Sequence, residues 1–311
     1  MNPIDLFEET YAALSANKVR SGLTVLGIVI GISSVIAMIS IGKGAESSIQ
    51  DSIKSIGSNL VIVVSGAQQG PGVALSGGRG SAKTLTLSDS EAIEKEIGST
   101  IGVAPEVTAR YQVAASGKNT NTQVVGVTPS YPAVRNFDVS VGSFITDQDM
   151  RRASKVAVIG PTVRNDLFGA DTSPIGQTVR IKNTDFRIIG ITKQKGGTGF
   201  SNPDEFVLIP LSTAQRYLSG DTYVTLISVA AKDTESTMAI QEDIIALLLR
   251  RHKISDPGLA DFSTINQTDI ISAASAITET FTILLGAVAG ISLLVGGIGI
   301  MNMMLTTVTE R

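Results

Sequence analysis

The sequence predicts an α+β external domain between two transmembrane α-helices, and three observations lead to this fold class. First, 43% of the 311 residues are hydrophobic and 17% are charged, which is more apolar than an average soluble domain. Second, uncharged apolar runs occupy residues 22–41 and 281–305, and each is long enough as a helix to cross a hydrocarbon core about 30 Å thick. Third, the long stretch between these runs has ordinary globular composition.

The first apolar run predicts a transmembrane helix over residues 21–42. The alternative is a cleaved signal peptide, but an acidic segment instead of a basic one precedes the run, and no A-x-A site follows promptly. Short terminal segments are poor candidates for translocation, whereas long loops cross largely regardless of charge. We therefore expect a multi-pass protein of the inner (cytoplasmic) membrane, with both termini cytoplasmic and the large domain periplasmic or extracellular.

Residues 1–20 predict an amphipathic interfacial helix, because apolar side chains repeat at helical spacing. These side chains belong to Ile4, Phe7, Tyr11 and Leu14. The polar face is acidic, so docking against a protein partner and anchoring at the lipid headgroups both stay open.

The external region alternates strand and helix patterns. A buried strand is predicted at 60–64, a Gly-rich loop at 66–80, and a helix that begins with a capping box of Ser88 and Glu91 and ends at Gly98. Further strands are predicted at 102–115, 122–127, 156–159, 177–182, 186–191, 206–209, 223–231 and 261–265, short helices around Val163 and Ala214, and an amphipathic helix at 233–252.

Two strand–helix–strand units therefore flank a middle segment. This arrangement predicts a discontinuous domain of residues 43–118 and 219–267, interrupted by an inserted subdomain of residues 119–218. The chain has no cysteine, so its hydrophobic core must hold the region together without disulfides.

After this domain, residues 268–305 predict one continuous helix of about 57 Å, at 1.5 Å per residue. Residues 268–280 would form a stalk, 281–305 the second transmembrane helix, and 306–311 the start of a cytoplasmic coupling segment. The alternative is a bend or break near Ser275, but no proline interrupts the pattern.

No catalytic, cofactor-binding or metal site is expected, because the chain has one histidine and no cysteine. His252 closes a helix beside Arg250, Arg251 and Lys253, where cations are favoured, and we interpret this run as a solvated face. The Gly-rich patches lack the lysine and hydroxyl spacing of a phosphate-binding loop, so any ATPase activity would reside elsewhere. The net charge of −3 and the absence of a basic stripe exclude a nucleic-acid partner.

Glycines in the two apolar runs form the most specific membrane signal, because small residues spaced by three others let helices approach closely. The expected helix-packing residues are Gly27, Gly31, Gly286, Gly290, Gly296, Gly297 and Gly299. The alternative is that glycine is simply common in transmembrane helices. Two helices make a poor bundle, so we expect their partners in another protomer or in sequence outside this chain.

Several segments resemble permeases of the MacB-type and FtsX-like ABC transporter family, and the resemblance covers essentially the whole chain. Residues 17–44 resemble the family's opening transmembrane segment, and residues 286–311 its second transmembrane helix and the start of its coupling region. PIGQTVRI, IPLSTAQ and LLLRRHKI followed by DFSTINQTD resemble its external core.

The resemblance implies a Porter-like domain with an inserted Sabre-like subdomain on stalk helices, above a homodimeric membrane region. It also implies mechanotransmission, in which a separate ATP-binding cassette subunit moves the external domain to drive export, with a periplasmic adaptor as a further partner. The family's permeases continue past the TVTER segment, so this chain is expected to be truncated. Of the family's ATPase-coupling segment, only the first residues have counterparts here, and these are Thr309, Glu310 and Arg311.

Two alternatives stay open from the sequence. The first is a lipoprotein-release or cell-division relative within the same permease class. The second is a two-helix membrane sensor or receptor, although no cytoplasmic output domain is present in the sequence and the glycine-rich second helix suits bundle packing better.

Overall fold

The computed structural model describes residues 22, 26–27, 29–33, 35–44, 59–66, 83–170, 172–196, 202–233 and 235–309. The chain divides into two compact units: Asp51–Ile270, and a second unit of Met1–Gln50 with Ile271–Arg311. The predicted interfacial helix of residues 1–20 and most of the Gly-rich stretch 66–80 lie outside the described residues.

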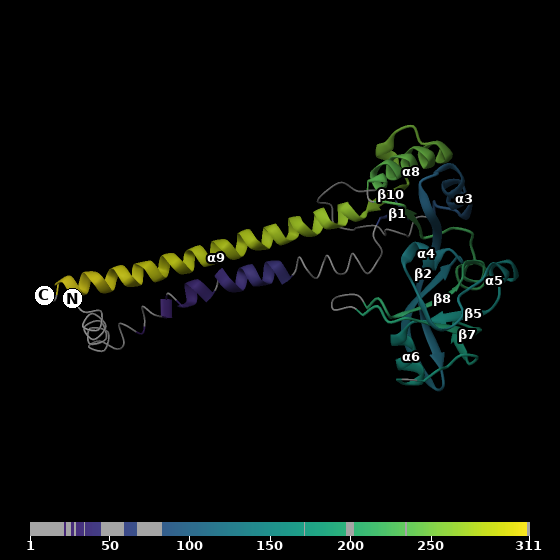
Figure 1. Ribbon diagram of the computed structural model, residues 1–311, viewed down its shortest axis with the longest axis horizontal. Coiled ribbons are helices and arrows are strands. Elements are labelled where there is room, and N and C mark those ends of the chain that lie inside the picture. The colour runs from purple at the N-terminus through teal and green to yellow at the C-terminus, as the bar shows by residue number, and fades with distance from the viewer. Residues whose placement is uncertain are drawn as a thin grey trace. The chain divides into compact units, whose positions relative to one another are not determined.

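The unit Asp51–Ile270 is a mixed α/β domain whose described residues form a ten-stranded sheet (Figure 1). The strand order is β10-β1-β9-β2-β3-β8-β5-β7-β4, and β6 pairs with both β2 and β7. The strands are β1 (Leu60–Ser65), β2 (Thr100–Ala115), β3 (Lys118–Val127), β4 (Val139–Gly142), β5 (Val156–Ile159), β6 (Thr178–Ile181), β7 (Thr184–Thr192), β8 (Phe206–Pro210), β9 (Leu226–Ala231) and β10 (Phe262–Asn266).

The helices of this unit are mostly short. They are α3 (Leu87–Glu96), α4 (Tyr131–Arg135), α5 (Asp147–Arg152), α6 (Pro161–Phe168), α7 (Leu211–Ala214), a π-helical turn (Gln215–Ser219), α8 (Ser236–His252) and a 3-10 turn (Pro257–Leu259). Helix α9 (Gln267–Thr309) begins at the residue after β10.

The long strand β2 joins two halves of the sheet. Residues 100–106 of β2 pair antiparallel with β9, and residues 107–115 pair antiparallel with β3. The first half of the sheet therefore contains β10, β1, β9 and the start of β2. The second half contains the rest of β2 with β3, β8, β5, β7, β4 and β6.

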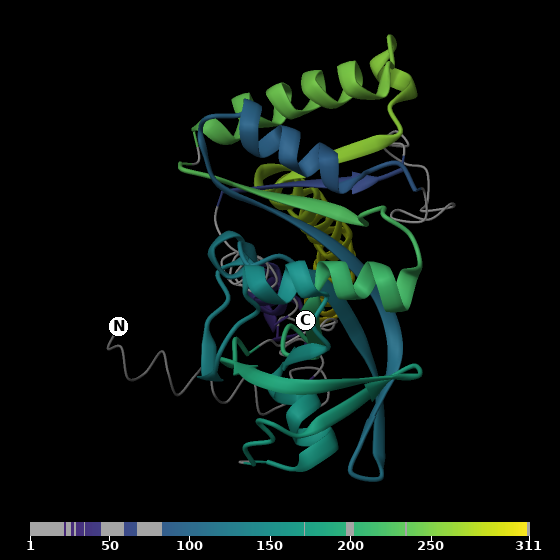
Figure 2. The same ribbon diagram turned by 90° about the vertical axis from the view of Figure 1, so that its right-hand side faces the viewer.

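Among the described residues, buried apolar side chains form three clusters: one mainly on the first half of the sheet, one on the second half, and one that includes residues of both halves. Helices α3 and α8 lie side by side over the first half (Figure 2), where Ile93 of α3 and Ile240, Ile244 and Leu248 of α8 are buried against Val229 of β9. The second half buries apolar side chains on both faces. Val163 and Leu167 of α6 belong to one core, and Tyr131 and Val134 of α4 belong to the other.

The predicted start of helix α3 is wrong by two residues. The capping box uses Thr86 and Asp89 instead of Ser88 and Glu91: the Asp89 carboxylate accepts from the Thr86 backbone N at 3.0 Å and from its hydroxyl at 2.7 Å. Both pairs fit the same sequence pattern. Asp89 also accepts from Arg251 of α8 at 2.8 Å, so a tertiary contact favours the earlier pair, and the helix ends at Glu96 before Gly98.

The remaining strand predictions in the external domain are confirmed within about two residues, apart from the longer start of β3 and the later start of β9. Helix α8 and the short helices around Val163 and Ala214 are also confirmed. The short elements α4, β4 and α5 were missed. The domain boundaries 43–118, 119–218 and 219–267 stay a prediction.

Helix α9 is a single element of 43 residues, without a break near Ser275. Its segment Ser275–Ile298 is long and apolar enough to cross a membrane, and it is the one such helix among the described residues. A shorter apolar helix covers Val29–Gly44. Large apolar side chains on α9 are exposed, including Ile283 at 67% and Leu294 at 68%. A surface of this kind matches lipid better than water.

Candidate functional site

Polar groups of β2 and β9 meet at the junction between the two halves of the sheet. Where β9 begins to pair with β2, the Thr225 backbone N donates to the Glu106 carbonyl O at 2.8 Å. The next interaction uses a side chain, because the Thr108 backbone N donates to the Thr225 hydroxyl at 3.1 Å. Both threonines line cavities on either side of this junction.

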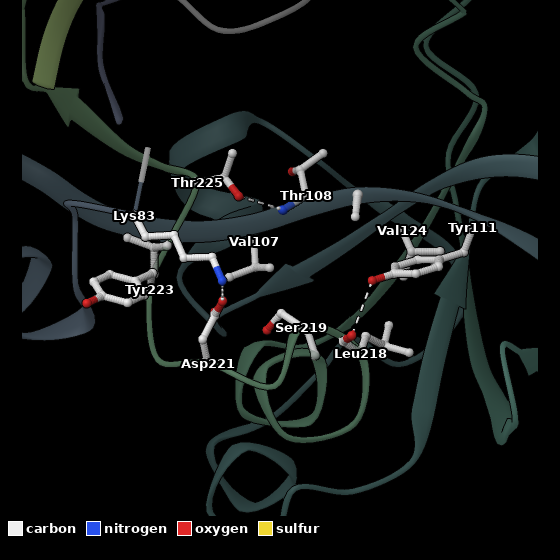
Figure 3. Close-up of a pocket in the computed structure, with 13 residues that line it drawn as sticks. Lys83, Val107, Thr108, Tyr111, Val124, Leu218, Ser219, Asp221, Tyr223 and Thr225 are labelled. Atoms are coloured by element: carbon white, nitrogen blue, oxygen red, sulfur yellow. Dashed lines mark hydrogen bonds and ion pairs between the residues drawn. The ribbon is translucent and has the colours of Figure 1, made fainter. Parts of the chain in front are cut away.

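The first cavity, here called the Tyr111 cavity, has a volume of about 260 Å³ (Figure 3). Its floor is apolar and includes Val107, Val124 and Leu218. At its rim the Lys83 ammonium and the Asp221 carboxylate form an ion pair at 2.6 Å, and this hydrogen bond raises the pKa of Lys83. The Lys83 side chain is 63% exposed, so solvent screens the pair strongly.

The second cavity, here called the Arg135 cavity, has a volume of about 420 Å³ and lies on the other side of the same two strands. Successive side chains of a strand point to opposite faces. Glu106 of β2 and Gln123 and Val125 of β3 therefore face the Arg135 cavity, whereas Val107 and Val124 face the Tyr111 cavity.

A buried ion pair forms one wall of the Arg135 cavity. The Arg135 Nε donates to Glu106 Oε1 at 3.0 Å, and the Ser228 hydroxyl donates to the same oxygen at 2.8 Å. The side chains of Arg135 and Glu106 are 15% and 4% exposed. Burial lowers the pKa of Arg135, but the charge of Glu106, the nearby Tyr131 and the hydrogen bond to Glu106 together outweigh burial. The pKa of Arg135 is therefore raised and the guanidinium stays charged.

Lys195 brings a second cation to the Arg135 cavity. Its ammonium donates to the Arg135 carbonyl O at 3.1 Å and lies 3.8 Å from the centroid of the Phe137 ring. Burial and the nearby charge of Arg135 lower the pKa of Lys195 to about 8, against the opposing effect of Asp204 and Asp138.

His252 is not on a solvated face, so that interpretation of the sequence is wrong. Its side chain is 11% exposed, with Nδ1 2.7 Å from Asp261 Oδ1 and Nε2 3.4 Å from Asp89 Oδ2. The ring also meets Phe262 edge to face at 5.9 Å. Asp89 is 163 residues from His252 in the sequence, and Asp261 lies 9 residues after it, beyond the end of α8. Helical position alone therefore could not reveal that the imidazole joins α8, α3 and the start of β10.

The start of α9 is held by polar contacts that the sequence analysis missed. The Asn266 side chain accepts from the Asp269 backbone N at 2.7 Å, and the Asp269 carboxylate accepts from the Asn266 backbone N at 3.0 Å. The Asn266 amide also donates to Gln241 of α8 at 2.6 Å. The N-x-x-D pattern before an apolar helix was the available signal.

The predicted helix-packing glycines have different surroundings in the unit formed by the two terminal segments. A Cβ added to Gly27 would lie 3.4 Å from the Gly296 Cα, and one added to Gly31 would lie 3.3 Å from Leu293 Cδ2. A Cβ on Gly286 would lie 3.8 Å from Met38 Sδ. These glycines therefore lie where the first apolar helix and α9 approach each other.

Gly290 and Gly297 have no described atom within 4 Å of an added Cβ. Both line an open apolar groove of about 380 Å³ along α9, with Leu293, Leu294, Ile298 and Met301. Gly299 lies within α9, and Thr309 is its last residue, whereas Glu310 and Arg311 lie outside the described residues. The described part of the chain contains no group of three side chains able to hold a metal ion.

Comparison with solved structures places the external fold in a class. The chain is similar to the periplasmic region of MacB from Actinobacillus actinomycetemcomitans, with a TM-score of 0.59 and 22% identity over 72% of this chain and 96% of that one. It is also similar to the extracellular domain of the noncanonic ABC-type transporter YknZ from Gram-positive bacteria, with a TM-score of 0.53 and 17% identity over 67% and 100% of the two chains. The fold is that of the mixed α/β domains these transporters carry outside the cytoplasm.

Sequence comparison gives the family. Residues 21–247 match the MacB-like periplasmic core domain, and the chain belongs to that family. Proteins named macrolide export ATP-binding/permease protein MacB are 38% identical in Bdellovibrio bacteriovorus and 40% identical in Azoarcus sp., each over 99% of this chain. The chain spans about half the length of these relatives, 47% and 45% respectively.

Proposed function

We propose that this chain is the permease part of a MacB-type ABC transporter, in which an external domain is moved by ATP hydrolysis to drive export. Helix α9 carries the proposal, because one continuous helix contains both the capped turn after β10 and the apolar span Ser275–Ile298. An uninterrupted helix can transmit displacement along its axis, since its backbone hydrogen bonds are satisfied internally.

The proposed topology has two transmembrane helices, at residues 21–42 and 281–305, with both termini in the cytoplasm and the mixed α/β domain outside the inner membrane. The exposed apolar side chains of α9 and the close approach of Gly27 to Gly296 support a membrane-embedded helix pair. Residues 268–280 would be the stalk, and Thr309, Glu310 and Arg311 would begin the segment that contacts the ATPase.

ATP hydrolysis would come from outside this sequence, from a separate ATP-binding cassette subunit. The names of the relatives include ATP binding, and about half of their length has no counterpart in this chain. For the full-length protein that contains this chain, we also expect a periplasmic adaptor as a partner and export of macrolide-like compounds.

Co-purification with the ATPase tests the proposal. The full-length protein that contains this chain would be purified in detergent with a separately encoded ATP-binding cassette subunit, and ATP turnover would be measured with and without the permease. We expect a stable complex and altered turnover. Failure of the two to associate, together with unchanged turnover, would remove the transporter proposal.

A homodimer through the open groove of α9 is the proposed membrane assembly. Gly290→Leu should fill this groove and reduce crosslinking between protomers in membranes, because small residues there permit close helix approach. Gly22→Leu is the matched control, since an added Cβ at Gly22 meets nothing within 4 Å and Gly22 does not line the groove. Equal crosslinking in both variants would count against the groove as the dimer contact.

A further inference from the structure

We propose that the Arg135 cavity binds a small organic oxyanion, a carboxylate or phosphate group with an apolar portion, through the Arg135 guanidinium and the Lys195 ammonium. Such a site would be separate from the transport proposal and does not depend on it. Four properties of the cavity carry the inference: unused donors, engaged acceptors, an apolar wall and a suitable volume.

The Arg135 guanidinium supplies the unused donors. A guanidinium has five N–H donors in a planar fork, and among the described residues Arg135 has one hydrogen-bond partner for them, Glu106 at Nε. The side chain is 15% exposed and lines the cavity. Buried donors of this kind favour a ligand that supplies acceptors.

Two carboxylates near the two cations already accept hydrogen bonds. Glu106 Oε1 accepts from both Arg135 and Ser228. Asp204 accepts from the backbone N of Lys195 at 2.9 Å and of Gly196 at 3.1 Å, one at each carboxylate oxygen. Asp204 does not line the cavity, whereas Glu205 does, and the Glu205 carboxylate lies 3.9 Å from the Arg110 guanidinium. Since each of these carboxylates has a donor or a cation of its own, an entering oxyanion would meet the Arg135 guanidinium and the Lys195 ammonium as its partners.

The two cations would also gain from an anion between them. Both Arg135 and Lys195 line the cavity, and the charge of Arg135 disfavours the charged form of Lys195. An anion that contacts both would offset this repulsion, and charge-assisted hydrogen bonds in a partly desolvated site are stronger than neutral ones.

The rest of the cavity suits an apolar portion. Val64, Val125, Phe137, Phe206 and Leu226 contribute apolar surface. The volume of about 420 Å³ falls in the range of sites for small organic molecules, about 300–1,000 Å³. By contrast, the Tyr111 cavity has its cation, Lys83, paired at the exposed rim, which leaves its interior without an unused charged donor among the described residues.

Calorimetric titration of the whole chain in nanodiscs of zwitterionic lipid tests the site. The probes are hexanoate, hexyl phosphate and hexanamide, which share an apolar tail and differ in the charge of the head. We expect one or both anions to bind at least about tenfold more tightly than hexanamide, because charged hydrogen bonds are the stronger ones. The tighter of the two anions identifies the head group that the site prefers.

Variants locate the binding in the cavity. Lys195→Gln should weaken binding of the preferred anion by about tenfold, and Arg135→Lys should do so while keeping a positive charge beside Glu106. Lys155→Gln is the matched control, because Lys155 also lies over an aromatic ring, that of Tyr217 at 4.7 Å, but does not line the cavity. Circular dichroism checks that each variant is folded.

Two results would overturn the proposal. One is anion binding no tighter than hexanamide binding by the unmodified chain, a result that requires no variant to fold. The other is anion binding that Lys155→Gln weakens as much as Lys195→Gln, since that outcome would assign the anion to general surface charge.

Discussion

The Tyr111 cavity and the Arg135 cavity share the strands β2 and β3, but their ion pairs differ in burial. At the Tyr111 cavity, the ion pair Lys83–Asp221 lies at the rim with a lysine that is 63% exposed. At the Arg135 cavity, the pair Arg135–Glu106 is 15% and 4% exposed. The exposed pair has the shorter distance, 2.6 Å against 3.0 Å, although we expect the buried pair to contribute more to stability. Burial, not separation, decides what the loss of one partner costs.

The largest expected effect is that of Arg135→Met. It should lower the free energy of unfolding by about 3–5 kcal/mol, because it leaves the buried Glu106 carboxylate without its cation. Urea unfolding of the whole chain, followed by circular dichroism, measures this. The double variant Arg135→Met with Glu106→Gln should be less destabilised than Arg135→Met alone, since it removes the uncompensated charge. Equal destabilisation would show that packing, not charge, dominates.

A smaller loss is expected at the second buried carboxylate, Asp89. Burial raises its pKa, but hydrogen bonds from Thr86 and Arg251 outweigh burial, so the pKa of Asp89 lies below its ordinary value of 3.8. Its stabilisation is therefore complete above pH 3.8 and is lost as the pH falls through the lower folded-state pKa. Asp89→Asn should cost about 1.5–3 kcal/mol at neutral pH.

The decrease in the free energy of unfolding at acidic pH, here called the acid limb, tests this role of Asp89. Asp89→Asn should remove part of the decrease in unfolding free energy below pH 3.8. Asp185→Asn, which breaks an exposed pair with Arg180 at 2.9 Å, should leave that limb unchanged. The same acid limb in the wild type and Asp89→Asn would contradict the assignment.

Lys195 should give a pH effect of the same direction, but at alkaline pH. Its folded-state pKa of about 8 lies below its ordinary value of 10.5, so the unfolded chain binds more protons between these values. The contribution of Lys195 to stability should therefore increase as the pH rises from about 8 to 10.5. Measuring the free energy of unfolding of the wild type and of Lys195→Gln across this pH range isolates the Lys195 contribution. Parallel pH profiles of the two proteins would contradict the lowered pKa.

The smallest effect is expected at the rim of the Tyr111 cavity. Asp221→Asn should leave the urea midpoint nearly unchanged, because water and salt screen an exposed ion pair. A decrease in the free energy of unfolding as large as that of Arg135→Met would contradict the difference proposed between the two cavities. It would show that Asp221 supports the cavity in some way other than through Lys83.

The external domain also shows where sequence patterns succeed and fail. Strand β5 was predicted at its observed bounds, Val156–Ile159, because a short continuous apolar run is buried on both faces. Helix α8 followed from its apolar stripe at helical spacing. The short elements α4 and β4 have too few residues to establish a period, and α4 supplies Arg135.

The cluster around His252 had a weaker signal. The run Arg250 to Lys253 at a helix end predicts solvent exposure by composition, and Lys253 and Arg251 follow that pattern in part. His252 departs from it because Asp89 and Asp261 approach from other elements. A single sequence contains no information about which carboxylates meet one imidazole across a fold.

The sequence by itself determined the apolar runs, the presence of both strands and helices in the domain between them, and most of its strands and longer helices. Those features depend on local composition and on periods of 2 and 3.6 residues, which are visible along the chain. Only the tertiary structure decided that β2 joins two halves of a sheet, that Glu106 and Arg135 meet beside a cavity, and that Gly27 lies against Gly296. These contacts join residues far apart in sequence, and their energies depend on burial, which no local pattern specifies.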